Sequence, residues 1–204
     1  MSLFNGFTAG LLLITLSELG EKTFFIAAIL AMRHPRRWVF VGATAALFTM
    51  TVLSVLIGQV AAIFPQQYVN GIAAALFIGF GLKLLYDALK MSGNKGLAHE
   101  QADAYKAVEQ REQGVIAWSI RAVVIEAFTL TFIGEWGDRT QIATITLAAA
   151  NNPLGVIIGA TLGHAICAAI AVVCGKLLVG RISERLLISV GGVLFIIFGV
   201  VTIS

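Results

Sequence analysis

The amino-acid sequence predicts an all-α integral membrane protein, with six transmembrane helices arranged as two inverted three-helix repeats. Of the 204 residues, 58% are hydrophobic and only 12% are charged, and the mean hydropathy is +0.91. Because soluble domains carry about 25% charged residues, this composition argues against a soluble enzyme. Two further observations complete the prediction: six apolar stretches near the roughly 20 residues that cross a bilayer, and an internal repetition of the sequence.

The six apolar stretches are separated by polar segments. In chain order they are Leu3–Met32, Trp38–Phe64, Val69–Leu89, Val123–Ala150, Leu154–Val179 and Leu186–Ile203. All three prolines lie in the short gaps, where a helix has to end in any case: Pro35, Pro65 and Pro153. A long polar segment separates the third stretch from the fourth. We therefore expect a first repeat over residues 1–90, a cytoplasmic linker over 91–114 and a second repeat over 115–204.

Apart from Lys22, Lys83 and Arg139 inside the stretches, basic residues occur only in or beside alternate gaps. They follow the first stretch, occupy the linker and its edge, and lie at or after the end of the fifth stretch: Arg33, Arg36, Arg37, Lys90, Lys95, Lys106, Arg111, Lys176, Arg181 and Arg185. The two termini and the gaps after the second and fourth stretches contain none. Since positively charged loops face the cytoplasm, we expect both termini outside and the linker inside. No basic segment precedes the first stretch, so we do not expect a cleaved signal peptide.

The chain repeats itself. The segment SELGEKT at Ser17–Thr23 reappears as GEWGDRT at Gly134–Thr140, an offset of 117 residues (135 − 18). The same offset relates VGAT at 41–44 to IGAT at 158–161. A unit with an odd number of spans enters the membrane in opposite directions in its two copies. Inverted repeats are typical of transporters, whose binding site lies at the repeat interface near the midplane.

Four acidic residues lie near the middle of the first and fourth apolar stretches, in two pairs spaced three apart: Glu18 with Glu21, and Glu135 with Asp138. We expect each pair to share one helix face and all four carboxylates to meet between the repeats. Each charge at this depth costs roughly 2.5–3.5 kcal/mol, so protons, a cation, or Lys22 and Arg139 must compensate for it.

The neighbours of the acids are suited to holding a cation. Gly20 and Gly137 would allow close helix approach or local unwinding. Neutral oxygen donors accompany both pairs: Ser17, Thr23, Thr140 and Gln141. A carboxylate-rich, all-oxygen cage suits a hard divalent cation such as Ca²⁺ or Mn²⁺. If protons occupy the same cage when it is empty, cation binding expels them, and the sequence predicts a cation/proton antiporter.

Three other interpretations remain open from the residues alone. In the first, Glu18–Lys22 and Glu135–Arg139 are closed salt bridges of a structural or assembly protein. In the second, the acids bind a cationic organic solute such as a basic amino acid, which would need a larger cavity with apolar walls. The third is a membrane enzyme, but the sequence has no nucleophile–base pair and no zinc-type cluster. We expect no enzymatic activity and no cofactor.

Several polar residues are weaker candidates. His164 could relay protons, or it could be a neutral imidazole bonded between helices. Glu126 could relay protons along an access path, or it could pair with Arg121 or face interfacial water. Thr44 and Thr161 recur in the two GAT triplets, either as packing residues or as polar liners of the site.

The paired acidic motif resembles the signature E-x-G-D-[KR]-[TS] of the manganese/calcium cation–proton exchangers. This family includes the Golgi manganese transporter of animals and bacterial manganese exporters, within the lysine-exporter superfamily. The second copy, Glu135–Thr140, fits every position, whereas the first has Glu21 where the family has Asp. The resemblance implies that the metal and proton ligands are Glu18, Glu21, Glu135 and Asp138. It also implies export of Mn²⁺ or Ca²⁺ across a bacterial plasma membrane. The expected partners are the bilayer and the metal ion, with a homodimer as an option and no nucleic acid.

Overall fold

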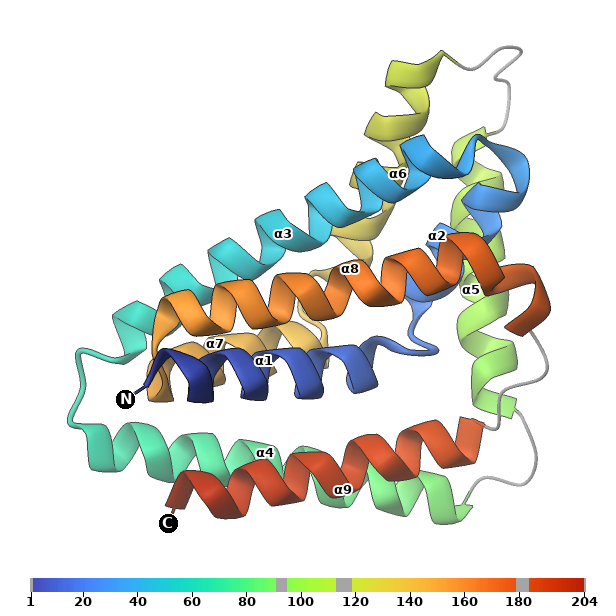
Figure 1. The fold of residues 1–204 in the computed structure, drawn as a ribbon. Helices are drawn as coiled ribbons and strands as arrows, with labels where there is room; N and C mark the ends of the chain where they lie inside the picture. Colours follow the sequence, from blue (N-terminus) through green and yellow to red (C-terminus); the bar gives the residue numbers. More distant parts are fainter. Residues whose placement is uncertain (1, 91–94, 113–118, 179–183, 204) are drawn as a thin grey trace.

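The computed structural model describes residues 2–90, 95–112, 119–178 and 184–203. All the regular secondary structure in these ranges is α-helical (Figure 1). The helices are, in chain order, α1 (Leu3–Glu18), α2 (Lys22–Arg33), α3 (Arg36–Ala61), α4 (Gln66–Lys90), α5 (Lys95–Glu112), α6 (Ile120–Glu135), α7 (Arg139–Ala150), α8 (Pro153–Leu178) and α9 (Glu184–Ile203).

The first and fourth apolar stretches are each broken into two helices. Gly20, between α1 and α2, has φ = 87°, and Gly137, between α6 and α7, has φ = 81°. Glycine adopts this left-handed conformation readily because it has no Cβ, and the conformation ends the preceding helix. Of the two outcomes that the sequence left open at these glycines, the structure shows local unwinding, and the breaks fall inside the acidic motifs.

Three of the described helices are long and apolar enough to cross a membrane: Arg36–Ala61, Gln66–Lys90 and Pro153–Cys174. At 1.5 Å per residue the 26 residues of α3 extend over about 39 Å, more than the roughly 30 Å of hydrocarbon in a bilayer. Two further helices are apolar but shorter, Leu3–Glu18 and Ile188–Thr202. Large apolar side chains on these helices face outward, among them Phe48, Leu56 and Ile72, as expected for contact with lipid.

The helices pack in pairs that combine the two halves of the chain. Helix α1 lies along α8, α3 lies against α6 and α7, and α4 lies along α9 (Figure 1). Glycines allow the closest contacts. A Cβ on Gly42 of α3 would lie 2.5 Å from the carbonyl oxygen of Val124, and a Cβ on Gly159 of α8 would lie closer still to that of Phe7. Only glycine fits at such distances.

Helix bounds repeat with the offset seen in the sequence. Helices α6, α7 and α8 begin at residues 120, 139 and 153, each 117 residues after α1, α2 and α3 at residues 3, 22 and 36. The glycine contacts obey the same relation, because Gly42 with Val124 corresponds to Gly159 with Phe7. The similarity between the halves therefore extends from the motifs to the packing.

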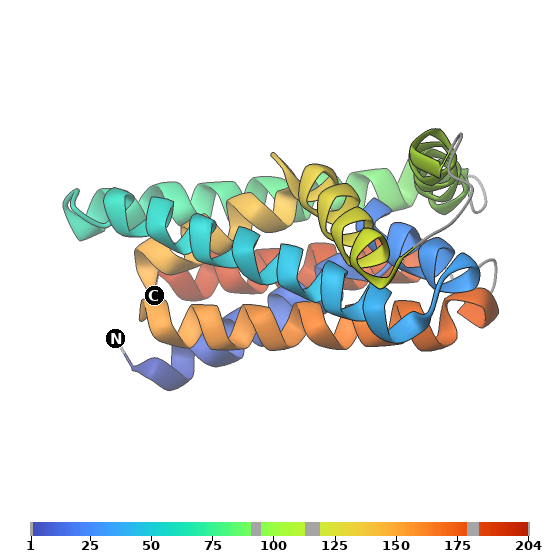
Figure 2. The same cartoon turned by 90° about the horizontal axis from the view of Figure 1, so that it is seen from above.

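Helix α5 lies across the end of the bundle opposite to both termini (Figures 1 and 2). It comes from the polar linker, but Ala104 and Val108 are fully buried in the same apolar cluster as α2. The linker helix is thus packed onto the apolar helices.

Candidate cation site

The acidic motifs place their carboxylates on either side of the two helix breaks. Glu18 is the last residue of α1, and Glu21 is the N-cap of α2. Glu135 and Asp138 occupy the same positions between α6 and α7. The expectation that each pair shares one helix face is wrong, because the positive φ at the intervening glycine changes the direction of the chain.

Three of the four carboxylates form a buried cluster. Glu18, Glu21 and Glu135 each offer an oxygen within 4.8 Å of the oxygens of the other two. These residues are only 2%, 6% and 1% exposed. The two halves therefore bring acids that are more than a hundred residues apart in sequence into one group.

Threonine hydroxyls hold two of these glutamates in the same way in both halves. Thr23 Oγ1 donates to Glu18 Oε1 at 2.8 Å, and Thr140 Oγ1 donates to Glu135 Oε2 at 2.9 Å. Each bond crosses a helix break and joins the start of the second helix to the end of the first. Threonine therefore orients one oxygen of each of these carboxylates.

One oxygen of each clustered glutamate is left without a hydrogen bond to any described residue: Oε2 of Glu18, Oε2 of Glu21 and Oε1 of Glu135. A buried acceptor of this kind is costly, and an unpaired buried charge is more so. The cluster therefore needs a proton or a cation to complete it.

Positive charge reaches the cluster from the opposite half of the chain. Arg139 Nη2 donates to Glu21 Oε1 at 2.8 Å, and Arg139 Nε lies 4.0 Å from Asp138 Oδ1. The pairs expected of a purely structural role, Glu18–Lys22 and Glu135–Arg139, do not occur among the ion pairs of the described residues. Arg139 thus links the two halves through Glu21 and also contacts Asp138 of its own motif.

A cavity of about 270 Å³ connects Glu21 with α5. Its lining residues are Glu21, Lys22, Thr23, Glu100, Gly134, Trp136, Gly137, Asp138 and Arg139. The Asp138 side chain is 31% exposed and lies here beside Glu21, outside the three-carboxylate group. Burial raises the pKa of the Glu100 carboxyl above its ordinary value, while Arg139 acts in the opposite direction.

The remaining candidates occupy several environments. His164 Nδ1 lies 3.4 Å from Glu18 Oε2, and the imidazole is 4% exposed. Gln141 accepts a hydrogen bond from the Gly137 amide at 2.7 Å and donates to Met50 Sδ, so it supports the break between α6 and α7. Three of the predicted supporting hydroxyl groups are buried without a hydrogen bond to a described residue, those of Ser17, Thr44 and Thr161.

Glu126 lies apart from the cluster. It is buried on α6, and its Oε2 lies 3.8 Å from His34 Nε2. It forms no ion pair with Arg121 in the part of the chain that the structure describes. Sequence reasoning did not select His34, Glu112 or Glu100, because they lie outside the repeated motifs. The one available signal was a histidine directly before Pro35, at the end of an apolar stretch.

Comparison with known proteins identifies the family of the chain. The chain matches the family described as divalent cation/proton antiporter GDT1 over residues 6–92 and 123–204, which include both acidic motifs. No solved structure matches the chain.

Several similar proteins are GDT1-like. One from Synechocystis sp. is 54% identical over 204 residues, covering 98% of this chain and 97% of its own. GDT1-like protein 5 of Arabidopsis thaliana is 42% identical over 217 residues, covering 98% of this chain and 95% of its own. GDT1-like protein 3 of Oryza sativa subsp. indica is 42% identical over 207 residues, covering 97% of this chain and 73% of its own. The chain belongs to the GDT1 family of divalent cation/proton antiporters.

Proposed function

We propose that this protein exports Mn²⁺, or alternatively Ca²⁺, from the cytoplasm in exchange for protons. The observation that carries the proposal is the group of three buried carboxylates, each with an oxygen that lacks a hydrogen bond to any described residue. Ca²⁺ binds oxygens at about 2.3–2.6 Å, so opposing ligands lie up to about 5 Å apart. The 4.8 Å limit on the glutamate oxygens is compatible with a single ion.

The proposed architecture is six membrane passes in two inverted repeats. Support comes from the common offset of helix bounds and from the reciprocal contacts of α1 with α8 and of α6 with α3. In this arrangement, α1 and α6 would end at the site and α2 and α7 would begin there. Helix C-terminal ends favour cations and N-terminal ends favour carboxylates, so both sets of ends would suit a cation held by acids.

Asp138 is proposed as the fourth ligand and the first to meet the cation. It lines the cavity beside α5, next to Glu21, and is more exposed than the clustered glutamates. A cation entering from the α5 side would contact Asp138 and Glu21 before it reached Glu18 and Glu135. Its charge would weaken the hold of Arg139 on Glu21, which frees a carboxylate oxygen for coordination.

Exchange follows from competition for the same oxygens. Without a cation, the buried glutamates require protons or Arg139 to offset their charge. A divalent cation would displace those protons, and opening of the site to the other side would let protons return. His164, 3.4 Å from Glu18, is placed to carry protons to and from the cluster. The membrane potential contributes about 2.3 kcal/mol per elementary charge for each 100 mV.

The proposal is tested with purified protein in liposomes that contain a metal-sensitive dye and a pH dye. Mn²⁺ entry is expected with a counterflow of protons. Glu18→Gln and Glu135→Gln, which keep the shape and remove the charge, should reduce both signals to background, because the cluster loses a ligand. Glu109→Gln, an exposed residue on α5, is the matched control and should transport normally.

Folding of each variant is checked by its elution profile in size-exclusion chromatography. Equal Mn²⁺ flux in the wild type and in both cluster variants would refute the site. Uptake of a basic amino acid that Mn²⁺ does not inhibit would instead favour the organic-solute interpretation.

A further inference from the structure

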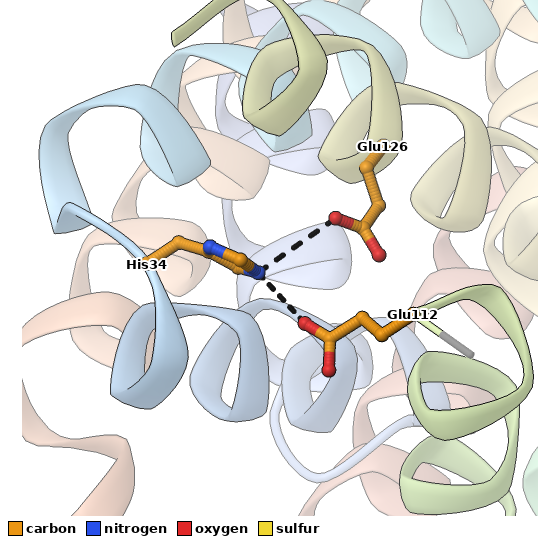
Figure 3. A group of neighbouring side chains, drawn as sticks. All are labelled: His34, Glu112 and Glu126. Atoms are coloured by element: carbon orange, nitrogen blue, oxygen red, sulfur yellow. Dashed lines mark hydrogen bonds and ion pairs between the residues drawn. The ribbon is translucent and has the colours of Figure 1, made fainter. Parts of the chain in front are cut away.

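A second group of metal-ligating side chains lies at the end of the bundle where α2 ends. His34 is the C-cap of α2, Glu112 is the last residue of α5, and Glu126 lies on α6. Figure 3 shows one nitrogen of the His34 ring directed at both carboxylates. Three separate elements therefore converge on one point, outside the acidic motifs.

The distances are those of a compact group. His34 Nε2 lies 2.7 Å from Glu112 Oε1 and 3.8 Å from Glu126 Oε2. One ligand atom from each residue lies within 4.8 Å of the other two. The side chains of His34, Glu112 and Glu126 are 7%, 14% and 2% exposed. Bulk water has little access to them.

The environment of the Glu126 carboxylate points to a bound ligand. Neither of its carboxylate oxygens has a hydrogen bond to a described residue, although the side chain is almost completely buried. The single proton that Nε2 can carry is directed to Glu112, and 3.8 Å is too long for a hydrogen bond to Glu126. A carboxylate buried in this way requires compensation.

The charges of the group also favour a cation. Glu112 and Glu126 together carry two negative charges, and Arg33 binds the other oxygen of Glu112. Glu112 is therefore paired with an arginine, whereas the group at ion-pair distance from Glu126 among the described residues is the His34 imidazole. A divalent cation between the three ligand atoms would replace the Nε2 proton and complete the coordination of Glu126.

We infer that His34, Glu112 and Glu126 form a second divalent-cation site, separate from the cluster of Glu18, Glu21 and Glu135. An imidazole nitrogen with two carboxylates favours first-row transition metals such as Mn²⁺ and Zn²⁺ over Ca²⁺ and Mg²⁺, which prefer oxygen ligands. Because its ligands come from α2, α5 and α6, the bound ion fixes the linker helix to both halves of the chain. This inference does not depend on the proposed transport activity.

The test measures Mn²⁺ bound to the purified full-length protein by electron paramagnetic resonance. It uses the wild type and Glu135→Gln, which lacks a ligand of the first cluster. Glu135→Gln should still bind one Mn²⁺ with ¹⁴N modulation in the electron spin echo, which reports imidazole coordination. Adding His34→Gln should abolish both the binding and the modulation. Adding Glu126→Gln should weaken Mn²⁺ binding about tenfold or more, as for losses within a metal site.

Two matched histidine variants identify the source of the nitrogen. His99→Gln removes an exposed imidazole on α5, and His164→Gln removes the imidazole beside Glu18. Both should keep the modulation in the Glu135→Gln background, and Zn²⁺ should displace Mn²⁺ more effectively than Ca²⁺ does. The inference is overturned if Glu135→Gln binds no Mn²⁺, if the modulation survives His34→Gln, or if His164→Gln abolishes it.

Discussion

Individual carboxylates in this molecule differ mainly in what surrounds their oxygens. Thr23 and Thr140 orient one oxygen of Glu18 and of Glu135, and each glutamate keeps a second oxygen without a hydrogen bond to a described residue. Glu100 lies at the other extreme, half-buried on the cavity wall and supplied by the linker helix. A carboxylate in such a position makes the stability of the fold sensitive to pH.

Glu100→Gln is expected to stabilise the protein at neutral pH and to have no effect in acid. Burial raises the pKa of Glu100 in the folded state above its ordinary value of 4.5, so the folded state holds the proton more tightly than the unfolded state. Unfolding then releases a proton, and the stability contributed by this residue falls as pH rises from 4.5 through the raised value. Thermal unfolding in detergent should give the wild type and Glu100→Gln equal midpoints at about pH 4. At about pH 7.5 the wild type should have the lower midpoint. A higher wild-type midpoint at neutral pH would contradict this assignment.

Repetition in the sequence was sufficient to select Glu18, Glu21 and Glu135, and the structure brings them together. Repetition did not distinguish Asp138 from these three acids, because the exposure of a side chain beside a helix break depends on the packing of α5. The group of His34, Glu112 and Glu126 has no local signature. His34 and Glu112 are 78 residues apart, and only the docking of α5 brings them into contact.

At the level of helices, the sequence predicted the apolar stretches well but not the interruption of two of them. Apolar residues continue on both sides of Gly20 and Gly137, so hydropathy alone indicates one long helix. The glycines allow either local unwinding or close packing, and which of the two occurs depends on tertiary contacts. Their φ angles of 87° and 81° show that unwinding is the outcome at both positions.

Packing between α3 and α6 gives a prediction about helix contacts. Gly42→Ala should destabilise the protein by about 1–3 kcal/mol, since the new Cβ would meet the Val124 carbonyl oxygen at 2.5 Å. Gly79→Ala on α4 is the matched control. Outside its own turn of helix, no atom of the described residues lies within 4 Å of its added Cβ, so alanine should be neutral or stabilise the helix by up to about 1 kcal/mol. Thermal unfolding of both variants measures the difference, and equal effects would mean that α3 and α6 are not in close contact.

For the molecule as a whole, the termini and α5 lie at opposite ends of the bundle (Figure 1). This agrees with the separation of basic from uncharged gaps in the sequence, which favours a cytoplasmic α5. The sequence could not show that the linker helix packs on α2, because among its described residues only Ala104 and Val108 belong to the buried apolar cluster.

Single-cysteine labelling tests this orientation. In a background with Cys167→Ala and Cys174→Ala, Ser2→Cys should react with a membrane-impermeant maleimide in intact bacterial cells. Glu109→Cys on α5 should react only after the cells are permeabilised, because basic loops stay in the cytoplasm. The opposite pattern would invert the proposed direction of transport while leaving the site unchanged.

The ion pair between Arg139 and Glu21 breaks the equivalence of the two halves. The corresponding residues, Lys22 and Asp138, form no ion pair in the structure over the ranges it describes. If inverted repeats exchange conformations during a cycle, the opposite end state would pair Lys22 with Asp138 and release Arg139. Arginine can hold a carboxylate with two parallel hydrogen bonds, and lysine cannot. The two end states would then differ in energy even with an empty site, which gives the carrier a preferred resting orientation.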